Sequence, residues 1–240
     1  MKNVKKLLAL VLALAMVLAL SACGSGPKGS VSAPADSSTG TASAPETASE
    51  PTPEPEDELE IGSIVGGTYE NDFAGIGCKL DSSWTYFTDE ELLELNGIVA
   101  DSIDDEELAE QLRDSDTFYD MAAMADEGLT TVNVVVENLG LLYGAVLDTG
   151  SYIDISLENL ESQLSGMGLN VTACEKDSFD FCGKPSDGIH ISGTMDVEGY
   201  EIEMFERMAF VKAGTYMFCI TACTYFEDTT SDILDLFYAV

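Results

Sequence analysis

The clearest hydrophobic pattern in the chain lies near its C-terminal end, over residues 215–225. Successive side chains of a strand point to opposite faces, and here both alternating sets are largely apolar. One set is Tyr216, Phe218, Ile220 and Ala222, and the other is Met217, Cys219, Thr221 and Cys223. Neither face suits water, so the pattern predicts a central strand of a sheet that is covered on both faces.

The two preceding segments predict partners for this strand. Residues 188–195 and 200–212 also have strand patterns, and they are joined through the turn-forming sequences 196–199 and 213–214. Three consecutive strands with tight turns form an antiparallel meander.

Two regions nearer the N-terminus predict further strands. Residues 131–137 alternate, with three valines on one face. Residues 72–80 and 83–87 predict a hairpin that turns near Asp81 and Ser82.

Four segments have the spacing of helices that would cover the sheet. Thr88 and Glu91 form a capping-box sequence before three leucines, and Asn96-Gly97 ends that helix. The other three are residues 104–113, residues 155–167 with Leu157, Leu160, Leu164 and Met167 on one stripe, and a last helix that starts near Thr229 or Thr230 and presents Ile233, Leu234 and Phe237. The predicted fold class is α+β, an antiparallel sheet covered by helices on both faces.

The N-terminal segment is a predicted signal peptide, residues 1–22. Three lysines precede the apolar run Leu7–Leu20, which is too short to span a bilayer comfortably. The quartet Leu20-Ser21-Ala22-Cys23 resembles a bacterial lipobox. This resemblance implies that residues 1–22 are removed, that Cys23 is lipidated, and that the protein is held at the extracytoplasmic face of the cell membrane. The alternative is an ordinary signal cleaved after Ala22.

Composition divides the remainder into a tether and one domain. Residues 23–58 follow the predicted cleavage site. They are mainly Ser, Thr, Ala, Pro, Gly and Glu and contain no aromatic side chain, which predicts a disordered linker. Residues 59–240 show no repeat and no second linker, and their length suits a single domain with its own core.

The domain resembles the PsbP/Mog1-like family of α/β/α sandwiches. The likeness is carried by the run from Tyr69 to Trp84, with Phe73, Gly75 and Leu80 inside it, by the acidic helix that follows, and by the closing hairpin and C-terminal helix. Members of this family act mostly as binding or assembly modules, and no shared catalytic residue can be carried over. The resemblance therefore informs fold more than function.

The domain is strongly acidic. It holds 6 basic and 37 acidic residues, a net charge of about −31. Such a surface repels nucleic acid and anionic lipid and favours cations or basic partners, but a solvated acidic surface that maintains solubility is the preferred explanation of the charge. The acidic run from Asp101 to Asp116 and the cluster Glu227, Asp228, Asp232 and Asp235 are the candidate cation ligands, but neither has a recognised calcium spacing.

Side chains with catalytic or redox potential are few. Besides Cys23 there are five cysteines, an odd number: Cys78, Cys174, Cys182, Cys219 and Cys223. Cys219 and Cys223 share a strand face about 13 Å apart, too far for a disulfide. Cys174 and Cys182 would pair only across a hairpin, and buried free thiols are the preferred interpretation.

His190 is the one histidine of the chain, so a hydrolase would need it, together with a serine such as Ser192. No catalytic signature surrounds either residue. We therefore predict no catalytic, cofactor-binding or metal-binding residue.

Three functions remain open from sequence. The leading hypothesis is a non-enzymatic, lipid-anchored lipoprotein that serves as an interaction or assembly module at the cell envelope, with an envelope protein as partner. The second is a surface lipoprotein that binds a cation or small ligand through its acidic face. The third is an envelope hydrolase.

Calcium distinguishes the second hypothesis from a merely solvated acidic surface. We expect thermal unfolding of residues 59–240 to be the same in chelator and in millimolar calcium or magnesium at matched ionic strength. A site at a hundredfold excess of ligand over its dissociation constant would add about 2.7 kcal/mol of stability. A large calcium-specific rise in melting temperature would support the cation-binding hypothesis instead.

Overall fold

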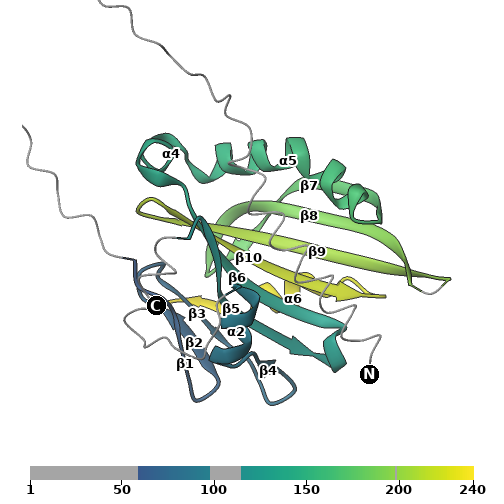
Figure 1. Cartoon of the computed structure of the whole chain (residues 1–240), viewed down its shortest axis with the longest axis horizontal. Helices are drawn as coiled ribbons and strands as arrows, with labels where there is room; N and C mark the ends of the chain where they lie inside the picture. The colour runs from purple at the N-terminus through teal and green to yellow at the C-terminus, as the bar shows by residue number, and fades with distance from the viewer. Residues whose placement is uncertain (1–58, 98–114, 198) are drawn as a thin grey trace, which may run out of the picture.

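Two antiparallel sheets form the framework of the computed structural model, which describes residues 59–97, 115–197 and 199–240 (Figure 1). In spatial order the larger sheet contains β4 (Thr85–Tyr86), β5 (Thr117–Ala125), β6 (Thr130–Asn138), β10 (Tyr216–Tyr225), β9 (Tyr200–Ala213), β8 (Lys184–Val197) and β7 (Leu169–Phe181). The smaller sheet contains β1 (Ser63–Val65), β2 (Thr68–Asn71), β3 (Ile76–Lys79) and β11 (Phe237–Ala239).

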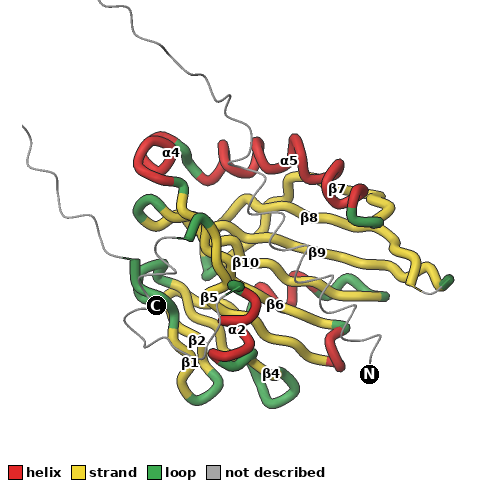
Figure 2. The backbone as a smooth tube through the Cα atoms, in the orientation of Figure 1, coloured by secondary structure: helices red, strands yellow, loops and turns green. Residues whose placement is uncertain are grey.

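Helices are short apart from one (Figure 2). They are α2 (Asp89–Leu95), α4 (Gly140–Val146), α5 (Thr149–Gly166) and α6 (Thr230–Leu234), with a 3-10 turn at Asp126–Gly128. None of the helices within the described ranges is both long and apolar enough to cross a bilayer.

Strand β10 lies inside the larger sheet, as its pattern predicts. It pairs with β6 on one side and with β9 on the other, and its residues from Met217 to Tyr225 are all buried. The predicted meander is confirmed as β8, β9 and β10, and the predicted strand over residues 131–137 is β6.

The predicted hairpin over residues 72–87 is wrong. β3 pairs with β2 and β11 in the smaller sheet, whereas β4 pairs with β5 in the larger one. The turn at Asp81, where the Trp84 N–H donates to the Asp81 carbonyl at 3.2 Å, passes the chain from one sheet to the other. The local alternation gave no sign that β11, from the far end of the chain, pairs with β3.

The two faces of the larger sheet are covered differently. On the first face, α5 buries Ile153, Leu160 and Leu164, and Leu92 and Leu95 of α2 pack against the same core. On the second face the cover is the smaller sheet together with α6. The larger sheet is thus covered on both faces as expected. On the second face, however, much of the cover is a second sheet, where the sequence predicted helices.

Most predicted helix ends are confirmed, including the start of the last helix, which is α6. The expectation that this helix presents Phe237 is wrong, because Phe237 lies in β11. Thr88 and Glu91 form the capping box of α2, and Asn96 is its C-cap. The helix expected over residues 155–167 is α5, which begins earlier because Asp148 caps it by accepting from the Ser151 N–H at 2.7 Å. Residues 104–113 lie outside the described part of the chain.

One buried carboxylate joins the two sheets. A register shift between Tyr119 and Met121 leaves Asp120 as an extra residue in β5. Its carboxylate accepts hydrogen bonds from the Tyr69 hydroxyl at 2.5 Å, the Asn71 amide at 2.9 Å and the Gly62 N–H at 2.8 Å. All three donors belong to the smaller sheet or the segment leading into it. Burial raises the pKa of Asp120, although these hydrogen bonds act in the opposite direction.

Candidate functional site

A cluster of charged side chains lies on the second face of the larger sheet, beside α6. Its centre is Arg207 of β9, which lies directly opposite His190 of β8 in the strand register. The Arg207 guanidinium pairs with Asp177 of β7, and its Nη2 lies 3.9 Å from Asp228 Oδ2. Its Nε donates to Thr230 Oγ1 at 3.3 Å. We call these five residues the Arg207 cluster.

Asp228 links the strands of the cluster to the start of α6. Its Oδ2 lies 2.9 Å from His190 Nε2, and its Oδ1 accepts from the Thr230 hydroxyl at 2.6 Å. Partial burial alone would raise the pKa of Asp228, but the hydrogen bonds from Thr230 and His190 lower it overall. Asp228 therefore stays ionised and holds the His190 ring in place.

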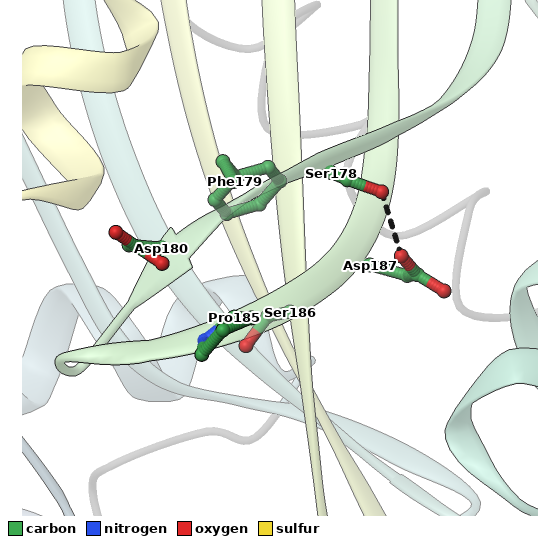
Figure 3. Close-up of a pocket in the computed structure, with 6 residues that line it drawn as sticks. All are labelled: Ser178, Phe179, Asp180, Pro185, Ser186 and Asp187. Atoms are coloured by element: carbon green, nitrogen blue, oxygen red, sulfur yellow. Dashed lines mark hydrogen bonds between the residues drawn. The ribbon is translucent and has the colours of Figure 1, made fainter.

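An open hollow of about 520 Å³ adjoins this cluster at the turn between β7 and β8 (Figure 3). Its lining residues are Ser178, Phe179, Asp180, Pro185, Ser186 and Asp187. The Phe179 ring connects the two features, because its centroid lies 5.7 Å from the Arg207 guanidinium carbon. A Cβ at Gly188 would lie 2.6 Å from that ring, so glycine is required for Phe179 to lie against β8.

Side chains in the hollow are also engaged with one another. The Ser178 hydroxyl donates to Asp187 Oδ1 at 2.8 Å, as Figure 3 shows. The Lys176 ammonium lies 3.8 Å from Asp187 Oδ2 and 3.2 Å from Asp154 on α5. The cluster and the hollow carry the carboxylates of Asp177, Asp180, Asp187 and Asp228 against the basic groups of Lys176, Lys184 and Arg207. With a net charge of about −31 on the whole domain, this surface favours a cationic ligand or a basic peptide segment.

The structure separates His190 from the serine considered with it. His190 contacts Asp228, whereas the Ser192 hydroxyl lies 3.0 Å from that of Thr172. No hydrogen bond joins His190 to Ser192 among the contacts of the described residues. The arrangement needed for a serine nucleophile activated by this histidine is therefore not present in the structure.

The hairpin that would have paired Cys174 with Cys182 does not form. Residues 169–181 make one continuous strand, β7, so Cys174 lies in the middle of this strand and Cys182 just beyond its end. Both thiols are free, and burial raises the pKa of each to about 11. Cys78, Cys219 and Cys223 are buried free thiols, as expected.

The acidic segments gather no metal site in the part of the chain that the structure describes, where no group of three potential ligands occurs. Residues 101–114 of the first run lie outside that part, and Asp116 is exposed. In the second cluster only Asp228 joins the site, while Glu227, Asp232 and Asp235 are exposed and turned to solvent.

Sequence reasoning missed Arg207, the hub of the site. The available signal was an arginine, one of only six basic residues in the domain, directly after Glu206 in a strand that also carries Glu201 and Glu203. Its neighbour Glu206 points to the opposite face of the sheet. Glu206 is fully buried, neither of its carboxyl oxygens has a hydrogen-bond partner, and burial raises its pKa to about 8.

Comparisons with known proteins add little. No protein-family model and no curated protein matches this sequence. Among solved structures, LpqN of Mycobacterium tuberculosis, a protein described as involved in cell envelope biogenesis, aligns with 68% of this chain and 82% of its own. The TM-score is 0.36 and the identity 8%, a likeness too weak to support an argument about fold or function.

Glu206 gives the domain a distinctive dependence on pH. Because its pKa rises from 4.5 to about 8 on folding, the native state holds a proton that the unfolded state releases. This contribution to stability is complete below pH 4.5 and is lost as pH rises to about 8. We expect Glu206→Gln to remove the loss, making the variant more stable than the wild type at pH 8.5 by several kcal/mol, since one pKa unit corresponds to about 1.4 kcal/mol.

Urea unfolding at pH 5 and pH 8.5 measures this difference. Glu158→Gln, the same change at an exposed position of α5, is the control and should follow the wild type at both pH values. Equal pH slopes for the wild type and Glu206→Gln would show that Glu206 titrates normally.

Proposed function

We propose that this chain is a membrane-anchored lipoprotein of the bacterial envelope and that its domain binds the basic segment of an envelope protein without catalysing a reaction. The lipobox-like quartet that ends at Cys23 supports the anchor. The linker predicted over residues 23–58 would let the domain contact partners near the membrane.

The Arg207 cluster is the single observation that carries the binding role. Arg207, His190, Asp177 and Asp228 hold one another in fixed positions across β7, β8, β9 and the start of α6. A surface with locked side chains loses little conformational entropy on association, which favours recognition. Its excess of carboxylates favours a basic partner.

The same contacts support a role without catalysis. The Nε2 atom of His190 is engaged by Asp228, and burial keeps the cysteine thiols protonated near neutral pH. A thiolate nucleophile would need a lowered pKa. Asp228 could orient His190 as a general base, but no serine, threonine or cysteine among the described residues is hydrogen-bonded to the His190 ring. The PsbP/Mog1-like resemblance implies a binding or assembly role too, and we retain it as the finer hypothesis of fold.

Binding of a small cationic ligand is a second candidate function. The hollow between β7 and β8 has the volume of a small-molecule site and includes the carboxylates of Asp180 and Asp187. The hollow is open and lies beside the Arg207 cluster, so it is equally suited to holding one side chain of a basic peptide. The calcium titration described above tests the inorganic form of this alternative.

Site-specific photo-crosslinking in the bacterium that encodes the protein tests the proposed function. A photoreactive side chain at Ser186, in the hollow, should give one discrete adduct to an envelope protein, attached within a basic segment that mass spectrometry identifies. The same probe at the exposed Glu158 of α5 is the matched control and should not give that adduct. Neutralising the hollow with Asp180→Asn and Asp187→Asn should reduce the yield severalfold, because the attraction is electrostatic.

The Cys23→Ser variant tests the lipid anchor in the same experiment. This variant should leave the membrane fraction and lose the adduct, whereas Cys174→Ser should retain both. Repeated failure to recover an adduct at Ser186 above background, or identical adducts at Ser186 and Glu158, would contradict the proposal.

A further inference from the structure

Helix α4 presents an apolar surface that the rest of the domain leaves uncovered. Leu141 is 66% exposed, Leu142 83%, Tyr143 59% and Val146 78%. No charged residue occurs from Asn138 to Leu147, in a domain whose net charge is about −31. Soluble helices normally place polar side chains on their outer face, so α4 has the composition of a helix that contacts an apolar phase.

The domain fixes α4 in this position. The Leu139 N–H donates to the Thr215 carbonyl at 2.9 Å, and the Leu139 side chain is buried in the first core. Gly144 packs so closely on the turn between β9 and β10 that a Cβ would lie 2.8 Å from Thr215 Cα. Gly144 therefore lies on the side of α4 that packs on the domain, and the four apolar side chains are exposed. Figure 1 shows α4 at one end of the domain, before α5 begins.

We propose that α4 inserts its apolar side chains into the interface of the bilayer that holds the Cys23 lipid. This inference rests on the anchor in the proposed function. About 35 residues separate Cys23 from Leu59, and a chain of that length spans at most about 120 Å, so the bilayer is always within reach of the domain. Tethering raises the effective concentration of the membrane around α4, so a weak contact is sufficient.

The side chains of α4 fit this occupant. Leucine and valine enter the boundary of the acyl chains, and tyrosine prefers the level of the headgroups. A second copy of the chain fits less well, because each domain carries about 31 negative charges and pairing would bring two such surfaces together. The same charge predicts that α4 inserts more readily into zwitterionic than into anionic lipid.

Tryptophan fluorescence on the lipidated full chain tests this contact. Trp84 is the only tryptophan, so Trp84→Phe gives a silent background into which Tyr143→Trp is introduced. In vesicles of brominated phosphatidylcholine we expect at least twofold quenching of this probe and a blue shift of its emission. Glu158→Trp on α5, in the same background, is the control and should not be quenched.

Leu142→Glu with Val146→Glu should abolish the quenching. Both positions are exposed, so folding should be preserved, and circular dichroism checks this. Flotation of the vesicles reports the anchor separately. If the protein floats but the Tyr143→Trp probe is not quenched, the proposal is overturned and the anchor is intact. If the emission instead shifts to the blue with rising protein concentration and without bromine quenching, α4 contacts a second copy of the chain. Protein that does not float overturns both the anchor and this contact.

Discussion

The buried carboxylate of Asp120 is the interaction on which the two-sheet arrangement depends. Strand β10 is apolar on both faces, so the larger sheet is stable only when both faces are covered. Helix α5 covers the first face with packed leucines and isoleucine, but the second cover is a separate sheet that the chain must hold in one position. The register shift in β5 fixes the position of the smaller sheet, because it directs Asp120 toward Tyr69, Asn71 and Gly62. These residues provide three donors that offset the cost of burying the Asp120 carboxylate.

The placement of the smaller sheet also determines where the charged site lies. After β10 the chain forms α6 and then β11, which pairs with β3 and so fixes the C-terminal segment against the second face. This path places Asp228 and Thr230 next to Arg207, while Asp177 arrives from β7. The smaller sheet and α6, which cover the second face and complete its core, thus also position the Arg207 cluster. Helix α4 is held independently of it, through Leu139 and Gly144 at the turn between β9 and β10.

The sequence predicted those parts of the fold that depend on neighbouring residues. The meander β8–β9–β10 follows from strand alternation interrupted by short turns, and α2 follows from the capping box at Thr88. The predictions that failed needed knowledge of distant partners. β3 pairs with β11, about 160 residues away, rather than with its neighbour β4, and Cys174 lies within a strand too long to form the expected hairpin. The Arg207 cluster was missed for the same reason, because Asp177, Arg207 and Asp228 come from three separate segments that meet only in the fold.

A double-mutant cycle on Asp120 and Tyr69 tests the central claim most directly. Asp120→Asn, Tyr69→Phe and the double variant would be compared with the wild type by urea unfolding, with the exposed Asp116→Asn as control. If the buried carboxylate joins the two sheets, Asp120→Asn should cost about 1–3 kcal/mol, Asp116→Asn at most about 0.5 kcal/mol, and the coupling between Asp120 and Tyr69 should exceed about 1 kcal/mol. Additive effects, together with an Asp120→Asn variant as stable as the wild type, would contradict this account and show that apolar packing alone holds the smaller sheet in place.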